Sequence, residues 1–440
     1  MSLLIISFCI VLLILLITKF KVNAFLAFLI ISILAGLLLG IDANQITKSI
    51  ERGIGDMLGS LVIVVVFGAM LGKLAADSGA AQRIASGMMN LFGPKYIQWA
   101  LVVTGFIIGI PLFYNVGFVL VVPLIFSVAY KYKFPVVYIG LPMLAALSVT
   151  HGFLPPHPSP TALVTQFDAD LGKTLLYGIV IAIPTVIIAG PLFSRTLKKM
   201  NPTPLDTFTA EPKPENELPG LGISIFSALL PVILLTGTSV INGSLTGNGI
   251  LTTTLLFLSD PSIVMIISLI FATFTLGINM NMGMKKVMNI YAEAVKDISM
   301  LLLIMGGAGA LKQILIDSGV SAEVGLMLTG LDVHPLFLGW VIACIIRVCV
   351  GSATVAGLTA AGIIAPLVMA TGVDPNLMVL AVGAGSLMFS HVNDAGFWLF
   401  KEYFNLSIKD TMKSWSVMET IVGIVGLIGV LILQFIIHPS

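Results

Sequence analysis

Apolar runs of about 20 residues recur from one end of this chain to the other, separated by short segments that carry most of its charge. An α-helix of about that length spans the hydrocarbon core of a bilayer. Only 10% of the 440 residues are charged, against about 25% in soluble domains. The sequence therefore predicts an all-α integral membrane protein with the lipid bilayer around it.

Composition also argues against several other classes of protein. The net charge of +1 leaves no clustered basic face, so we expect no nucleic-acid partner. Cys9, Cys344 and Cys349 all lie inside apolar runs, and their spacing fits neither a zinc site nor a disulfide framework. We therefore expect no metal and no cofactor. The first apolar run, 3–17, has no basic residue before it, which favours a retained span over a signal peptide.

Apolar length and flanking charge predict about ten full spans and two interrupted segments. The full spans are expected at 2–18, 22–40, 58–76, 136–165, 174–193, 222–242, 258–280, 298–316, 376–404 and 416–437. The interrupted segments, 97–130 and 335–371, each form either a re-entrant hairpin or two short spans. The stretch from Arg195 to Gly220 is rich in proline and charge, which is typical of an exposed linker.

The distribution of basic residues orients this layout. Lys and Arg concentrate in the cytoplasmic loops of membrane proteins. Five clusters fall on one side of the predicted topology: Lys19/Lys21, Lys131/Lys133, Arg195/Lys198/Lys199, Lys285/Lys286 and Lys409/Lys413. We therefore expect a first membrane repeat at 1–195, a cytoplasmic linker at 196–220 and a second membrane repeat at 221–440.

The two halves show weak but ordered similarity. A shift of 240 residues places Asp77-Ser78-Gly79 on Asp317-Ser318-Gly319, and it places His151 on His391. Each half is expected to have about five full spans plus one interrupted segment. Because five is odd, the second copy should sit upside down in the membrane. Inverted-topology repeats with broken helices near the midplane are typical of secondary transporters.

Four helix breaks are predicted, in two pairs. The interrupted segments break at GIPLFYNVGF (109–118) and VGSATVAG (350–357). HGFLPPHPSPTA (151–162) has four prolines and cannot stay helical, and SHVNDAGF (390–397) is its partner in the second half. Breaks at membrane depth must line a cavity or be buried in protein. Half-helices that begin there aim N–H groups at the site, which suits an anion.

These breaks supply the candidate site residues. The substrate-binding candidates are Asn115, Gly117, His157, Ser159, Thr161, Arg347, Ser352, Thr354 and Asn393, and the proton-coupling candidates are His151, His391 and Asp394. Most have a structural alternative. The histidines could be packing hydrogen-bonders, Ser352 and Thr354 could join helices, and Asn393 with Asp394 could cap a half-helix. Arg347 could neutralise a substrate carboxylate or hold Asp394 in an ion pair.

The motifs PLFYNVGFVLVVPLIFSVA, LSVTHGFLPPHPSPTALV, GSATVAGLTAAGIIAPL and SHVNDAGFWLFKEYFNLS resemble those of the gluconate permease (GntP) family of proton symporters. The resemblance extends from about Val22 to Leu431. It implies a bacterial cytoplasmic-membrane carrier that imports gluconate, or a related sugar acid, together with a proton. Similar members take glycerate or D-serine. The hairpin tips also resemble those of the wider ion-transporter superfamily, and a homodimer is a candidate assembly.

Two rival classes are less favoured. An intramembrane enzyme needs a catalytic constellation, and His151 and His157 lack the HExxH spacing of a membrane metalloprotease. An anion channel needs polar groups along a continuous pore, whereas the polar residues here gather at mid-depth. The sequence favours a secondary active transporter that is not an enzyme.

Overall fold

A computed structural model describes residues 2–112, 114–200, 202, 213–242, 250–319, 333–392 and 394–437, and within these ranges the chain forms helices and no strands. Six of the described helices are long and apolar enough to cross a membrane, or up to eight if each bent pair is one span. This is fewer than the ten full spans expected. The difference arises because several apolar helices, such as Ala24–Leu38 and Pro375–Leu387, are shorter than the sequence pattern suggests.

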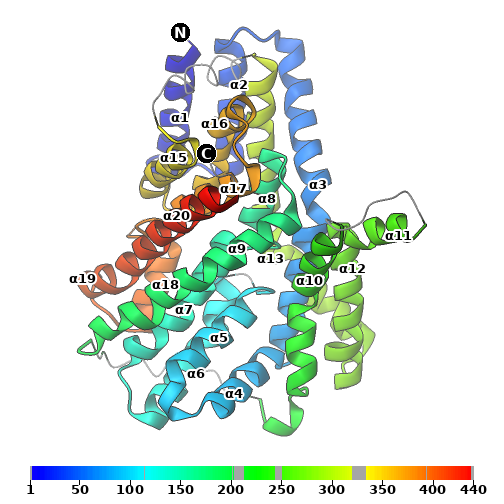
Figure 1. Ribbon diagram of the computed structural model, residues 1–440. Coiled ribbons are helices and arrows are strands. Elements are labelled where there is room, and N and C mark those ends of the chain that lie inside the picture. Colours follow the sequence, from blue (N-terminus) through cyan, green and yellow to red (C-terminus); the bar gives the residue numbers. More distant parts are fainter. Residues whose placement is uncertain are drawn as a thin grey trace.

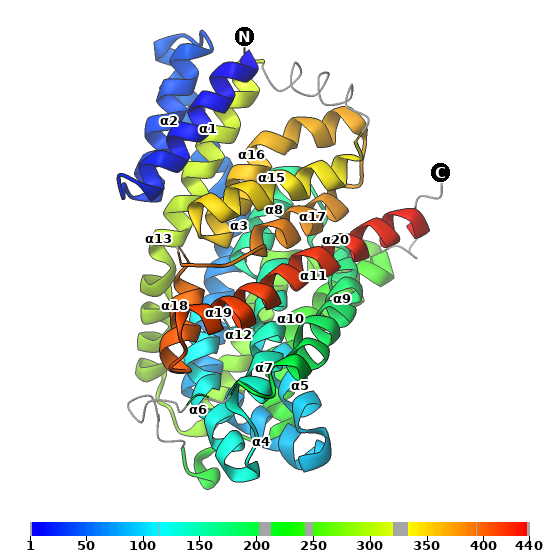
Figure 2. The same ribbon diagram turned by 90° about the vertical axis from the view of Figure 1, so that its left-hand side faces the viewer.

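Two long helices form the spine of the molecule. They are α3 (Ala43–Asp77) and α13 (Met284–Asp317), which pack side by side (Figures 1 and 2). The expected spans 58–76 and 298–316 cover only their second halves, so both helices begin well before the spans expected from the sequence. The first halves carry charged residues on outward faces, which lowers their hydropathy, but the paired packing keeps them helical.

A close approach of two glycines holds this helix pair together. A Cβ added at Gly53 would collide with the backbone oxygen of Gly309, and a Cβ at Gly309 would collide with that of Gly53. Small residues at helix–helix contacts let backbones approach in this way. Nearby, the Ser49 hydroxyl donates a hydrogen bond to Asp317 Oδ2 at 2.6 Å, which joins α3 to the end of α13.

Both interrupted segments fold as helix–turn–helix units. In the first half, α5 (Ile97–Gly109) is followed by α6 (Tyr114–Tyr132). In the second, α15 (Pro335–Val350) ends at Gly351 and α16 (Ala353–Thr371) begins directly after Ser352. Gly351 has a φ of +81°, which favours glycine at this turn. The two units lie toward opposite ends of the molecule (Figure 1).

The two predicted broken spans are interrupted inside the expected segments. Helix α7 (Val136–Phe153) stops before a proline-rich turn that contains a cis peptide between Pro155 and Pro156, and α8 (Pro158–Phe167) follows. Helix α17 (Pro375–Leu387) ends at a turn that includes Phe389 at a φ of +47°, and α18 (Ala395–Tyr403) begins after Asp394.

The remaining helices surround these central elements. Helix α4 turns by 110° into α5, and α20 crosses the molecule against α17 and α9 (Figure 2). Their bounds are α1 (Ser2–Thr18), α2 (Ala24–Leu38), α4 (Ala80–Phe92), α9 (Leu171–Ile187), α10 (Leu221–Asn242), α11 (Ile250–Ser259), α12 (Pro261–Ala272), α19 (Ile408–Thr411) and α20 (Val417–Ile437). π-Helical turns at Ile188–Leu192, Thr273–Gly277 and Met412–Ser416 continue α9, α12 and α19.

Candidate functional site

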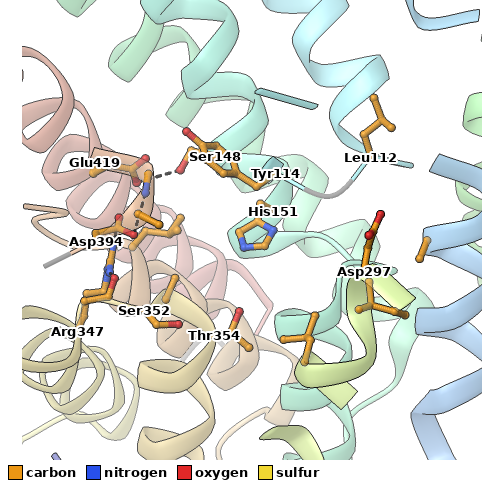
Figure 3. Close-up of a pocket in the computed structure, with 18 of the residues that line it drawn as sticks. Leu112, Tyr114, Ser148, His151, Asp297, Arg347, Ser352, Thr354, Asp394 and Glu419 are labelled. Carbon is orange, nitrogen blue, oxygen red and sulfur yellow. Dashed lines mark hydrogen bonds and ion pairs between the residues drawn. The ribbon is translucent and has the colours of Figure 1, made fainter. Parts of the chain in front are cut away.

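A cavity of about 650 Å³ lies where the helix breaks meet the long helix pair. Helices α3, α7, α13, α15, α16 and α20 contribute to its wall, with the segments that lead into α6 and α18 (Figure 3). Its polar and aromatic lining residues are Lys73, Tyr114, Ser148, His151, Asp297, Arg347, Ser352, Thr354, Asp394, Trp415 and Glu419. The cavity therefore joins residues from both halves of the sequence.

A buried ion pair forms one wall. Arg347, on the last turn of α15, is only 3% exposed, and its Nη2 lies 2.6 Å from Asp394 Oδ2. Its Nη1 donates to the backbone oxygen of Gly351, so the guanidinium also fixes the hairpin turn. Its Nε is buried and has no hydrogen-bond partner among the described residues. Arg347 thus pairs with Asp394 while it still lines the cavity.

Asp394 is positioned by the chain around it. Its Oδ1 accepts a hydrogen bond from the Gly396 N–H at 3.1 Å, so it caps α18, and its Oδ2 accepts from the Ser390 hydroxyl. The Trp415 indole N–H donates to Ser390 Oγ at 2.8 Å, and the Ser416 hydroxyl donates to the Ser390 backbone oxygen. Through these two hydrogen bonds to Ser390, the π-helical turn before α20 fixes the position of the chain between α17 and α18.

The tip of the second hairpin presents a helix N-terminus to the cavity. Ser352 and Thr354 both line it, and Ser352 Oγ accepts a hydrogen bond from the Val355 N–H at 3.4 Å. The first turn of α16 places its unpaired N–H groups and the positive end of its dipole here. An anion in the cavity would be stabilised by this helix end and by Arg347 together.

Ser148, Glu419 and Tyr114 form a further part of the cavity lining that was not predicted from the sequence. Ser148 on α7 donates a hydrogen bond to Glu419 Oε2 at 2.9 Å, and both side chains are 2% exposed. Tyr114 lies beside them (Figure 3), with its ring centroid 6.0 Å from that of Trp415. Glu419 is the one charged residue in α20, and an ionisable residue inside an apolar span is a functional candidate by default. A charged residue inside an otherwise apolar span is visible in the sequence, so sequence reasoning could have identified Glu419 as a candidate.

Charged residues from the long helices lie across the cavity from these groups. Lys73 on α3 has its Nζ 3.2 Å from Asp297 Oδ2 and 3.7 Å from Glu293 Oε2, both on α13. Lys73 and Asp297 line the cavity, and Asp297 lies on the side opposite Arg347 and Glu419 (Figure 3). The cavity therefore has a second cation in addition to Arg347.

The structure brings some of the predicted residues together and leaves others apart. His151, Arg347, Ser352, Thr354 and Asp394 line the cavity, whereas Gly117, His157, Ser159, Thr161 and His391 do not. Asn115 lies in the first turn of α6, where its side chain is outside the described part, and Asn393 lies outside the described residues.

The predicted residues outside the lining make other contacts. His157 Nε2 lies 2.5 Å from the Gly109 backbone oxygen, and its ring centroid is 5.3 Å from that of His151. His391 Nε2 lies 3.0 Å from the Val348 backbone oxygen. Over the described ranges, no group of three or more His, Cys, Asp or Glu side chains could hold a metal ion.

Solved structures place the fold among membrane transporters. The YdaH transporter of Alcanivorax borkumensis aligns with a TM-score of 0.67 at 15% identity, over 94% of this chain and 97% of that one. MtrF of Neisseria gonorrhoeae aligns with a TM-score of 0.63 at 13% identity, over 93% of this chain and 94% of that one. At these identities the likeness shows the fold alone.

Relatives found by sequence comparison share a much higher sequence identity with this chain than these solved structures do. A high-affinity gluconate transporter of Escherichia coli (strain K12) is 48% identical, with 99% of this chain and 100% of the relative covered. The Gnt-II system L-idonate transporter of the same strain is 46% identical, with 100% of this chain and 100% of the relative covered. A gluconate permease of Bacillus subtilis (strain 168) is 45% identical, with 99% of this chain and 100% of the relative covered. The profile of the GntP family permeases matches residues 1–436. The resemblance and the expectation of a multi-pass membrane transporter, not an enzyme, are confirmed, and the chain belongs to the GntP family of permeases.

Proposed function

We propose that this permease imports gluconate, or a closely related sugar acid, together with a proton across a bacterial cytoplasmic membrane. The strongest structural support is the cavity, where Arg347 and the N-terminus of α16 offer positive charge to a carboxylate. The relatives support the substrate class, because two are named for gluconate and one for L-idonate, another six-carbon sugar acid. All three come from bacteria.

The substrate would use different walls of the cavity for its different groups. Its carboxylate would lie near Arg347, Ser352 and Thr354, where cation, hydroxyls and helix N-terminus converge. Its hydroxyls would face the polar residues on α7, and its C–H groups would contact the rings of Tyr114 and Trp415. Asn115, at the start of α6, is one residue from Tyr114 and stays a candidate ligand.

The transport cycle would use the two repeats as moving parts. The helix order supports a division into 1–195, 196–220 and 221–440, because a long helix, a hairpin and a broken span follow one another in both halves. The hairpins at opposite ends of the molecule support the inverted relation. Rocking of one repeat against the other would expose the cavity to each side in turn.

Replacing Lys73 with methionine should raise the KM for gluconate about fivefold and leave the maximal rate nearly unchanged. Lys73 is partly exposed, so removing its charge should cost only about 1 kcal/mol of attraction for the anion. Initial rates of labelled gluconate uptake over a range of concentrations measure both constants. Lys48→Met, at an exposed position on the same helix, is the matched control and should leave the KM unchanged.

Competition in proteoliposomes tests the substrate assignment. Purified protein should take up labelled gluconate saturably, and excess unlabelled gluconate or L-idonate should suppress that uptake. Excess D-serine or glycerate should have little effect. Strong suppression by D-serine or glycerate, with weak suppression by gluconate, would assign the protein to the alternative substrates. Uptake that does not saturate would favour a channel over a carrier.

A further inference from the structure

Glu419 is an acidic group enclosed in the apolar interior. It is 2% exposed and lines the cavity from the first turn of α20, a helix whose other residues are uncharged. Its carboxylate accepts a hydrogen bond from Ser148, which is a neutral partner. An ionised carboxylate at membrane depth is costly unless a cation pairs with it, so such a group is rarely retained without a function.

No cation within the described ranges forms an ion pair with Glu419. Arg347 forms its ion pair with Asp394, at 2.6 Å, and Lys73 pairs with Asp297 and Glu293 on the other side of the cavity. The Tyr114 hydroxyl is uncharged and buried, and it has no hydrogen-bond partner in the part of the chain that the structure describes. While water is excluded from the cavity, the neutral acid is therefore the form of Glu419 that this environment accepts most readily.

We propose that Glu419 is the residue that carries the coupled proton, an assignment that rests on the proposed gluconate–proton symport. On the side of higher proton activity, the carboxylate takes one proton from water and becomes a neutral acid. The gluconate anion then binds beside it without repulsion. On the other side the cavity opens to water, gluconate leaves, and the hydrated carboxyl group returns its proton to the water. One negative charge and one proton cross together, so each turnover moves no net charge.

Repulsion makes the coupling obligatory. An ionised Glu419 and a substrate carboxylate would be two like charges in one cavity of low dielectric, which disfavours the substrate-bound state. Protonation removes one of the two charges. Gluconate affinity should therefore fall as pH rises and Glu419 ionises, and a glutamine at this position should abolish that dependence.

The other titratable residues around the cavity fit this role less well. Asp394 already forms an ion pair with Arg347 and accepts hydrogen bonds from the Ser390 hydroxyl and the Gly396 N–H. His151 is uncharged when unprotonated and so would not repel the anion. The titratable residues that line the cavity besides Glu419 are Lys73, Tyr114, His151, Asp297, Arg347 and Asp394. The elements that pack on α20 also carry Tyr138, Lys173, Tyr177, Cys344, Cys349 and Lys413, and none of these lines the cavity.

The test compares driven accumulation with exchange in proteoliposomes. With an inward proton gradient of one pH unit, the unaltered protein should concentrate labelled gluconate up to about tenfold. Glu419→Gln, which mimics the neutral acid, should bring the internal concentration only to about the external one, yet should still exchange labelled for unlabelled gluconate. Glu419→Asp should restore accumulation. Glu402→Gln, at an exposed position on α18, is the matched control and should accumulate normally.

Each outcome has a defined meaning. Retained exchange with lost accumulation in Glu419→Gln, rescued by aspartate, supports the assignment and shows that the variant is folded. Accumulation by Glu419→Gln equal to that of the unaltered protein overturns the assignment while symport stands. Loss of coupling only in a His151→Gln variant also overturns it. Absence of gluconate uptake by the unaltered protein overturns the proposed function, and the assignment falls with it.

Discussion

Replacing Arg347 with methionine should abolish gluconate uptake and destabilise the protein. The substitution removes the cation that faces the cavity, and it leaves the Asp394 side chain, which is 17% exposed, without its ion-pair partner. Removing one member of a buried ion pair costs about 3–5 kcal/mol. We expect the midpoint of thermal unfolding in detergent to fall by several degrees and gluconate binding to become undetectable.

The double variant Arg347→Met/Asp394→Asn separates the two roles of Arg347. It removes both charges, so the buried-charge penalty disappears and thermal stability should largely return. Uptake should stay absent, because the substrate carboxylate has still lost its countercharge. Recovery of both stability and uptake would contradict the binding role and would leave Arg347 as a structural partner of Asp394. The single variant Asp394→Asn completes a double-mutant cycle, which measures the energetic coupling between the two side chains.

Replacing Gly53 with leucine should disrupt the packing of α3 against α13 and strongly reduce the yield of folded protein. The new side chain would meet the backbone of Gly309, which cannot move aside as a flexible side chain could. Overpacking of this kind costs about 1–3 kcal/mol and occasionally more. Size-exclusion profiles and the midpoint of thermal unfolding measure the loss.

Gly55→Leu is the matched control for this substitution. It lies two residues further along the same helix, and a Cβ added there would meet no heavy atom within 4 Å. The control should express, unfold and transport like the unaltered protein. Equal damage from both substitutions would mean that leucine itself harms this part of α3, and the close approach to Gly309 would then not be the cause.

The sequence could predict the helix breaks because their causes are local. Pro155 and Pro156 interrupt the helix, Pro158 and Pro160 lie in the first turn of α8, where proline is tolerated, and Gly351 supplies a turn at φ +81°. Those breaks led to His151, Arg347, Ser352, Thr354 and Asp394, all of which line the cavity. Arg347 also stood out because a charge deep in an apolar run is costly.

The rest of the site depends on long-range packing. Ser148 and Glu419 are 271 residues apart, and nothing in either segment indicates that they meet. His157 and His391 share the broken segments with the cavity residues, but their side chains contact the backbone oxygens of Gly109 and Val348. Their place outside the lining depends on side-chain direction, which proximity to a helix break does not determine.

The most direct test of gluconate–proton symport is a simultaneous record of gluconate entry and proton entry in proteoliposomes. With gluconate outside and no imposed gradient, the account predicts external alkalinisation that tracks gluconate uptake, without any change in membrane potential. Under an inward proton gradient, accumulation should collapse when a protonophore is added. Accumulation that persists with the protonophore and follows a sodium gradient would contradict the account.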